Sequence, residues 1–382
     1  MTVLSADERD ELAHSVRAAC EKFAPEERVR AVAYDHPGAP QRGFDSELWK
    51  VLCNQVGVAA IALPEHLGGA GYGASALGVV AHELGRVLAP VPLVASTVLA
   101  TGLLLDLQGQ DPDAEKRLSG LLEGRRTAAA AITGDGGLWR RTAVTLTAAR
   151  GPDSWTVDGV VRHVLNGAAA DDLVVAATTT GEPAVFLVDP TADGIVVETE
   201  RVLDGTRPMA TVTFTGAHAI RLSGNGPVDD IIERNVDLAL AVLSAEQVGA
   251  CERLLEIATE YARTREQFDR PIGSFQAIKH RCADMLVGLE WARSASAAAL
   301  ESVDGDTAEM AGESDWRASM AKAVCSEALR DAAHANVQIH GGIGFTWEDS
   351  AHLYLRRART DEVLFGGPGQ HWDRLAARKK LL

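Results

Sequence analysis

The spacing of apolar residues changes twice along the chain, and each change marks a different kind of secondary structure. The first third has apolar residues three or four positions apart, as in DSELWKVLCNQVGV, which is typical of helices. The middle third consists of short β-branched segments such as MATVTFTGAHAI, separated by Gly, Pro and Asp, which predict strands. Long helical patterns then return. We therefore expect an α+β multidomain fold with a helical domain at residues 1–124, a β domain at 125–225 and a second helical domain at 226–382.

Composition places the chain among folded globular proteins and argues against one class of partner. The chain has 382 residues, of which 46% are hydrophobic, enough for a large core. Its 37 basic and 53 acidic residues give a formal charge of −16, which repels an extended phosphate backbone. We therefore expect no nucleic-acid partner.

Cysteine usage and the N-terminal segment favour a reducing, cytoplasmic location. An odd number of widely spaced cysteines fits neither a disulfide framework nor a structural metal cluster, so we expect reduced and mostly buried thiols. Ser5 and Glu8 have the spacing of a capping box, which predicts the start of a helix rather than a signal peptide. The cysteines are Cys20, Cys53, Cys251, Cys282 and Cys325.

One uncharged run, between Arg86 and Asp106, tests whether the chain crosses a membrane. Pro90 and Pro92 interrupt this run near its start and leave a segment too short to span a bilayer comfortably. We therefore expect a buried helix that begins after the prolines, and no association with a membrane.

The strongest local signal is YARTREQFDRPIGSFQ, at residues 261–276. The pattern predicts a helix that carries Arg265 and Gln267 to its C-terminal end, a turn at 271–273, and a second helix that opens at 274–276. Arginine offers a planar fork that suits a pyrophosphate, and Gln and Phe can bind a ribose or a ring. A plain helical hairpin, with basic residues near the end of the helix dipole, explains the same residues. The residues alone leave both interpretations open.

Other motifs exclude some kinds of site. In QIHGGIGFTWE, at 338–348, the adjacent glycines suit either a close backbone approach to a ligand or the end of a helix. HLGGAGYG, at 66–73, predicts a turn, and neither segment has the Rossmann spacing after a strand. Four scattered histidines lack metal-ligand spacing, so we expect no metal site. These four are His163, His334, His340 and His371.

Taken together, these segments resemble the acyl-CoA dehydrogenase family, and the resemblance extends along essentially the whole chain. LPEHLGGAGYG, TVDGVVRHVLNGAAADDLVV, TREQFDRPIGSFQ and QIHGGIGFTWE occur in the family's order and at its spacing. The resemblance implies an N-terminal helical domain, a central β domain and a C-terminal four-helix bundle, assembled as dimers or as tetramers of dimers. It also implies FAD-dependent α,β-dehydrogenation of an acyl-CoA thioester, in which a carboxylate removes the α-proton and the flavin accepts the β-hydride. An electron-transfer flavoprotein would then take up the electrons.

Seven positions that match the family's FAD site keep residues suited to binding FAD. Six of them match contacts that one subunit makes to the pyrophosphate and adenosine half of the FAD held mainly by its neighbour: Arg265, Gln267, Phe268, Gln276, Gln338 and Gly342. The seventh, Gln370, matches a contact on the flavin side.

The residues that surround the flavin ring in the family are replaced. The family's Trp-Ile-Thr/Ser-Asn segment corresponds to residues 163–166, His-Val-Leu-Asn, so both the aromatic wall and the hydroxyl are missing. The family's Thr-Glu-Pro…Gly-Ser-Asp loop is reduced to AITGDGG, which keeps little beyond Thr133.

The general base is missing from both positions where the family places it. The Glu of the family's Tyr-Glu-Gly-Thr sequence corresponds to Gly366, and the alternative position on the first bundle helix is Ala239. Loss of a positioned base costs about 10²–10⁴ in rate. Glu362, one helical turn before Gly366, is the candidate for a relocated base, and Glu246 is a weaker second. A plain surface carboxylate is the other interpretation of Glu362.

This selective loss favours a non-catalytic subunit. We expect the chain to pair with a second acyl-CoA dehydrogenase-type chain in a two-plus-two heterotetramer, similar to the paired enzymes of bacterial steroid side-chain degradation, one of whose subunits has a comparable Gly-Gly ending. The alternative is a homo-oligomeric acyl-CoA dehydrogenase that uses Glu362. A structural or regulatory protein without flavin is a third reading, and the retained Arg265 and Gln267 count against it.

Overall fold

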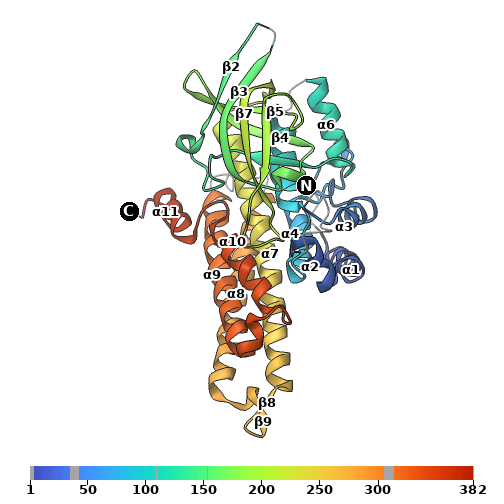
Figure 1. Cartoon of the computed structure of the whole chain (residues 1–382), viewed down its shortest axis with the longest axis vertical. Helices are drawn as coiled ribbons and strands as arrows, with labels where there is room; N and C mark the ends of the chain where they lie inside the picture. The colour runs from blue at the N-terminus through green and yellow to red at the C-terminus, as the bar shows by residue number, and fades with distance from the viewer. Residues whose placement is uncertain (1–3, 35–42, 108–110, 153, 305–313, 382) are drawn as a thin grey trace.

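The computed structural model describes residues 4–34, 43–107, 111–152, 154–304 and 314–381, and its architecture is the α+β fold predicted from the sequence (Figure 1). Helices occupy the chain up to Leu122, strands lie between Ala128 and Arg221, and long helices follow from Val228. The β domain lies at one end of the long axis, and a small two-stranded hairpin lies at the other (Figure 1).

The N-terminal part is helical, and its first helix begins with the predicted capping box. The Glu8 backbone N–H donates to the Ser5 hydroxyl (3.3 Å), and the Ser5 N–H donates to the Glu8 carboxylate (2.9 Å). The elements are α1 (Ala6–Phe23), α2 (Glu26–Tyr34), α3 (Ser46–Val51), η1 (Leu52–Val56), η2 (Glu65–Leu67), α4 (Gly73–Arg86), η3 (Leu93–Ala100), α5 (Thr101–Leu107) and α6 (Pro112–Leu122).

The uncharged run forms the buried helix that the sequence predicts. Helical structure begins directly after Pro92 as η3 and continues as α5, and most of its apolar side chains are buried. Within the described ranges, no helix combines the length and the apolar character needed to cross a membrane. All five cysteines are free thiols, of which three are buried.

The β domain is a closed ring of strands. Strands β4, β2, β3, β7 and β5 follow one another in the sheet, and antiparallel pairing of β5 with β4 closes the ring. Strand β1 pairs with β4 and β6 pairs with β7, and a separate apolar cluster fills the interior. The strands are β1 (Ala128–Ala131), β2 (Leu146–Arg150), β3 (Trp155–Leu165), β4 (Asp172–Thr179), β5 (Glu182–Val188), β6 (Ile195–Thr199) and β7 (Met209–Arg221).

In the C-terminal part, long helices run alongside one another, and α7 packs against α4, α8 and α9. Its apolar residues join those of the N-terminal helices in one continuous core. The elements are α7 (Val228–Thr264), β8 (Glu266–Gln267), β9 (Arg270–Pro271), η6 (Ile272–Ser274), α8 (Gln276–Asp304), α9 (Ser314–His340), η7 (Gly341–Phe345), α10 (Ala351–Val363) and α11 (Pro368–Arg378).

Two glycines allow α4 and α7 to cross at very short distance. A Cβ atom at Gly249 of α7 would lie 1.9 Å from the carbonyl oxygen of His82, and one at Gly85 of α4 would lie 2.0 Å from that of Glu246. Backbone contacts this close leave no room for any side chain. The crossing therefore depends on glycine at both positions.

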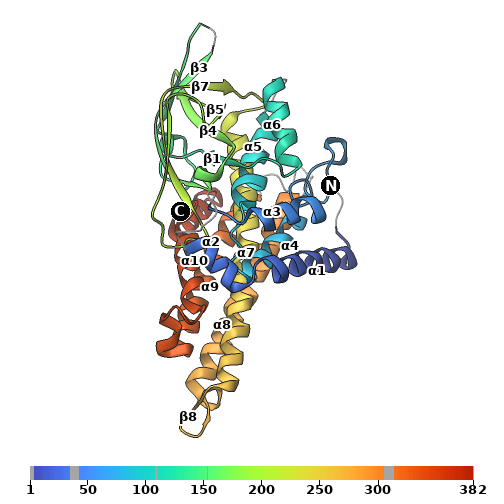
Figure 2. The ribbon, with the colours of Figure 1, turned by 45° about the vertical axis from the view of Figure 1, so that its right-hand side comes forward.

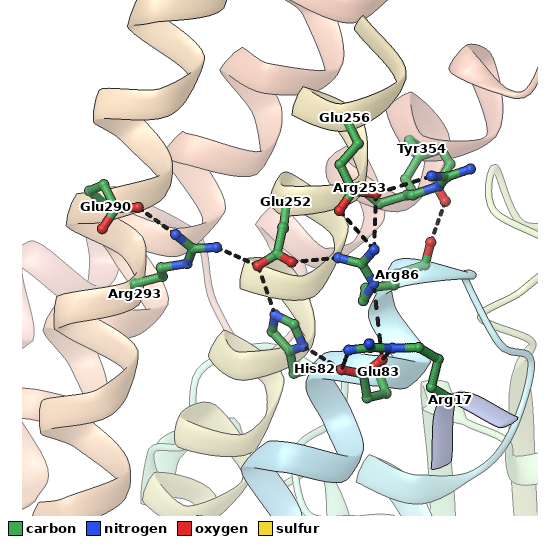
Figure 3. A network of polar contacts seen from close by, with 10 residues as sticks. All are labelled: Arg17, His82, Glu83, Arg86, Glu252, Arg253, Glu256, Glu290, Arg293 and Tyr354. Carbon is green, nitrogen blue, oxygen red and sulfur yellow. Dashed lines mark hydrogen bonds and ion pairs between the residues drawn. The ribbon is translucent and has the colours of Figure 1, made fainter. Parts of the chain in front are cut away.

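A network of charged side chains surrounds this crossing (Figure 3). Arg86 of α4 binds Glu252 (2.6 Å) and Glu256 (2.8 Å) of α7, and His82 bridges Glu83 and Glu252. Burial disfavours the charged imidazole, but the hydrogen bonds to the two carboxylates outweigh it and raise the pKa of His82. The network fixes how α7 lies against the N-terminal helices.

We predict that Gly249→Ala destabilises the fold by about 2 kcal/mol, because the added methyl group forces the two helices apart. Chemical denaturation measures the change in the free energy of unfolding. Gly369→Ala is the matched control, since a Cβ atom there meets nothing within 4 Å, and it should stay within about 0.5 kcal/mol of wild type. Equal effects of the two variants would contradict the role given to the crossing.

Candidate functional site

The residues predicted to hold FAD lie in two places, far apart in the molecule. Arg265, Gln267 and Phe268 belong to the β8–β9 hairpin at the end of the bundle, whereas the positions matching the flavin-ring wall and the catalytic base lie near the β domain (Figures 1 and 2). Along α7, the alternative base position Ala239 and Arg265 are 26 residues apart, roughly 39 Å at 1.5 Å per residue.

The hairpin corrects the prediction that a helix carries Arg265 and Gln267. Helix α7 ends at Thr264, and Arg265 leaves it with an extended backbone. Gln267 then pairs with Arg270 in the hairpin, whose turn residues Phe268 and Asp269 both have positive φ. The predicted end of the helix was wrong by a few residues, because the spacing of apolar residues does not define the exact residue at which a helix ends.

The hairpin presents its side chains to solvent. Every residue from 263 to 270 is exposed, and Phe268 is 85% exposed, with its ring edge-on to Phe275 (6.0 Å between centroids). An exposed guanidinium next to an exposed aromatic ring can bind a phosphate and stack on a flat group. This chemistry suits the pyrophosphate and adenosine half of a dinucleotide.

Three further predicted residues lie at the same end of the bundle. The ring of Tyr261 stacks on His340 (4.2 Å), which brings the end of α9 and η7 against the last turns of α7. Gln338 and Gly342 are exposed there, and a Cβ atom at Gly342 would meet nothing within 4 Å. Gln276 is exposed at the first position of α8 and bonds His280 (2.9 Å).

The place that matches the family's flavin-ring pocket is almost filled. Thr133, Gly136, His163, Leu165 and Phe365 are among the residues that surround it, and the remaining cavity has a volume of only about 20 Å³. Space of that size holds about one water molecule. A three-ring flavin cannot enter without movement of the surrounding residues.

Residues 133–139, which we call the closing loop, fill this place. The Phe365 N–H donates to the Gly136 carbonyl (3.2 Å), and the Arg162 N–H donates to that of Gly134 (2.9 Å). A Cβ atom at Gly366 would lie 2.9 Å from the Cβ of Leu138, so a glutamate there would collide with the loop. Leu138 thus occupies the space into which the side chain of a base at position 366 would point.

His163 replaces the family's aromatic wall and is held by a carboxylate. It has a positive φ (57°), and its Nδ1 lies 2.6 Å from the Glu200 carboxylate. Glu200 also accepts bonds from the His163 N–H (2.9 Å) and the Thr211 hydroxyl (2.7 Å). The imidazole is therefore oriented by β-domain residues.

Residues 365–367, which we call the Gly-Gly turn, are held by side chains from two helices. Nε2 of His371 lies 3.1 Å from the Phe365 carbonyl, and the Lys322 ammonium donates to the Gly366 carbonyl (3.1 Å). The Gln370 side chain accepts from the Gly367 N–H (3.0 Å) and so caps α11. Gln370, predicted as a flavin-side contact, serves the turn in this structure.

The two candidate carboxylates are engaged in ion pairs. Glu362 is only 13% exposed, and its oxygens bind Arg330 (3.0 Å) and Arg359 (2.6 Å), so it is not a free surface group. Glu246 is buried and pairs with Arg207 (2.7 Å) and Arg357. Neither carboxylate is poised to accept a proton from a substrate.

Sequence reasoning missed the residues that close the pocket. Leu138 follows a Gly-rich segment, and an apolar Leu-Trp pair after such a loop is a signal of burial. Lys322 lies within the otherwise apolar stretch SMAKAVC, which could have marked it as a buried lysine.

The two ends therefore fit FAD differently. The exposed hairpin suits the pyrophosphate half, whereas the pocket, with its surrounding residues in their present positions, has too little space for the ring. Among the described residues, no cluster of three or more His, Cys, Asp or Glu side chains could hold a metal ion.

The fold is that of a flavin-dependent dehydrogenase, and comparisons define the family. The family model "Acyl-CoA dehydrogenase, C-terminal domain" matches residues 230–380, and "Acyl-CoA dehydrogenase, N-terminal domain" matches residues 6–125. The chain belongs to the acyl-CoA dehydrogenase family, whose members are FAD-dependent oxidoreductases.

One curated relative and two solved structures illustrate the similarity. The acyl-CoA dehydrogenase IpdE2 of Mycobacterium tuberculosis is 34% identical over 372 residues, covering 97% of this chain and 96% of the relative. A chain of the ChsE4–ChsE5 complex from the same organism is 29% identical to this chain, with a TM-score of 0.86, and the match covers 100% of each of the two compared chains. The Tcur3481–Tcur3483 steroid enzyme variant is 28% identical, with a TM-score of 0.84 and 98% coverage of each chain.

We predict that His371 makes the protein sensitive to acid. Burial and the charges of Lys322 and Arg374 lower the pKa of His371 from 6.5 to about 3, and its Nδ1 has no hydrogen-bond partner within the described part of the chain. The unfolded state therefore takes up a proton below pH 6.5 that the folded state refuses until about pH 3, so stability falls as the pH is lowered through this window.

The test compares wild type with His371→Gln, which retains an amide that can donate to Phe365 but does not titrate. Between pH 7 and pH 5 the wild type should lose about 2 kcal/mol more free energy of unfolding than the variant. Identical pH profiles would show that His371 does not carry this acid sensitivity.

Proposed function

We propose that this chain is the non-catalytic subunit of a heteromeric acyl-CoA dehydrogenase. The observation that carries the proposal is the filled pocket: Leu138 lies against Gly366 where the family has a catalytic glutamate, and about 20 Å³ remains for a flavin ring. The catalytic base and the flavin-ring pocket then come from the partner subunit.

The position of the hairpin supports the same proposal. The β8–β9 hairpin, which carries Gln267 and Phe268 directly after Arg265, lies at the opposite end of the molecule from the β domain (Figure 1), so these residues are suited to a cofactor bound to another subunit. Large apolar side chains are exposed in the hairpin, along α8, and in and directly after η7, as expected of surfaces covered by a partner. They are Phe268, Leu286, Val287, Trp291, Ile343, Phe345 and Trp347.

The similar proteins suggest the assembly and the substrate class. The ChsE4–ChsE5 structure is a complex of two chains, and the Tcur3481–Tcur3483 structure is a steroid enzyme. By analogy, the assembly has two copies of each subunit, binds FAD at half of the usual sites, and oxidises a steroid-derived acyl-CoA thioester. An electron-transfer flavoprotein is the proposed electron acceptor.

The homo-oligomeric alternative depends on Glu362 as the base. Its two ion pairs, to Arg330 and Arg359, would have to break before the carboxylate could reach a substrate. The closing loop would also have to leave the pocket. Both requirements weigh against this alternative.

We predict that Arg265→Ala, made in the co-purified complex, weakens FAD binding by about tenfold to hundredfold, because charge-assisted bonds to the pyrophosphate are lost. Titration of FAD into the apo-complex measures the dissociation constant. Arg234→Ala is the matched control, since Arg234 is 64% exposed and lies near the opposite end of α7. Unchanged FAD affinity in the Arg265 variant would contradict the shared site.

A further inference from the structure

We propose that Lys322 is the positioning residue that keeps the flavin-ring pocket of this subunit closed, by holding the Gly-Gly turn against the closing loop. The inference rests on the proposed function, because closure has a consequence only in a subunit whose own pocket is not used. The inference explains what occupies the space that a base at position 366 would fill. It is argued from the contacts of Lys322, of the Gly-Gly turn and of the closing loop.

Lys322 is fully buried on α9, and each of its three N–H groups has an acceptor. Its Nζ atom lies 3.1 Å from the Ser326 hydroxyl, 3.2 Å from the Glu362 carbonyl and 3.1 Å from the Gly366 carbonyl. Two of these acceptors are backbone carbonyls at the end of α10 and in the turn. The lysine therefore ties α9 to the segment that carries position 366.

The Gly-Gly turn needs such a tie because its backbone is unusual. Phe365 has φ of 57° and Gly366 has φ of 103°, and the first of these is a strained conformation for a bulky residue. Strain of this kind persists only when surrounding contacts hold it in place. The bond from Lys322 is one such contact, and it comes from a rigid helix.

The Gly-Gly turn supports the closing loop. The Phe365 N–H donates to Gly136, and the bare Cα of Gly366 allows Leu138 to pack against it. Gly136 is itself confined, since its φ is 65° and a Cβ atom there would lie 2.9 Å from the His163 carbonyl. The sequence of contacts from Lys322 through the turn to Leu138 is therefore continuous.

Burial of an ammonium group lowers the stability of a fold unless hydrogen bonds or ion pairs compensate for its lost hydration. Burial lowers the pKa of Lys322 to about 8, while the charges of Asp361 and Glu362 act in the opposite direction. His371, from α11, contacts the other side of the turn. A methionine would fill the space of Lys322 without this desolvation cost, so the hydrogen bonds account for the lysine.

Hydrogen–deuterium exchange of the full-length chain tests the proposal. In Lys322→Met, exchange of the Phe365 amide and of residues 133–139 should rise about tenfold to hundredfold, because the bonds lost are charge-assisted. Exchange elsewhere, including β3 and the core of α7, should stay as in wild type. Exchange at Phe365 and in the closing loop that matches wild type would overturn the proposal.

Ser326→Ala is the matched control, since it removes one acceptor of Lys322 but leaves the bond to Gly366. Ser326→Ala should leave exchange at the turn unchanged. An increase in exchange equal to that in Lys322→Met would show that Lys322 stabilises the fold in general and does not specifically hold the turn. If Lys322→Met does not fold, Lys322→Gln, which retains a shorter amide donor, takes its place with the same expected location of faster exchange.

The FAD content of the wild-type complex separates the two proposals. One FAD per chain, rather than one for every two chains, would contradict the proposed function, while the exchange data would still test the role of Lys322. One FAD for every two chains, together with unchanged exchange at the turn in Lys322→Met, would support the proposed function and contradict the role of Lys322.

Discussion

The close crossing of α4 and α7 fixes the geometry on which function depends. Gly85 and Gly249 let the two backbones meet, and the ion pairs of Arg86 hold them there. Helix α7, with 37 residues, then extends beyond the N-terminal helices and ends in the exposed hairpin. Because α7 is a single rigid helix, Arg265 stays far from the pocket of its own chain. The proposed division of the cofactor site between subunits depends on this separation.

The filled pocket has a physical explanation. An open space large enough for a flavin ring would leave its apolar walls without contacts, and such cavities destabilise a fold in proportion to their volume. Leu138 and Phe365 supply those contacts, and both are buried. A subunit that never holds the ring gains stability from closure, whereas a subunit that binds the ring cannot close in this way. In the proposed non-catalytic subunit, the missing base and the closed pocket would therefore be two parts of one change.

Periodicity predicted most of the fold. The helical character of both ends of the chain, strands β3 to β7, the capping box at Ser5 and the buried helix after Pro92 were readable from local spacing. The short strand β2 was not predicted, and neither was β1, because its four residues are all alanine, a helix former, and its strand conformation comes from pairing with β4. The family resemblance located the base position at Gly366, but local patterns could not show what fills it.

The features of the pocket that were missed are non-local. Leu138 meets Gly366 from a distant part of the chain, and Lys322 reaches the same turn from another helix. The engagement of Glu362 by Arg330 also depends on how α9 lies against α10. Such contacts arise from tertiary packing, which a single sequence does not display. The hairpin differs from prediction for a local reason, since positive φ at Phe268 and Asp269 has no strong sequence signal.

The most direct measurement is the visible absorbance spectrum of the chain purified alone and of the chain co-purified with a related subunit, each before and after addition of acyl-CoA thioesters. The account predicts a colourless protein alone. It predicts one FAD for every two chains in the complex, bleached by a suitable thioester. Stoichiometric flavin in the isolated chain that bleaches with a thioester would contradict the account and would show that the pocket opens.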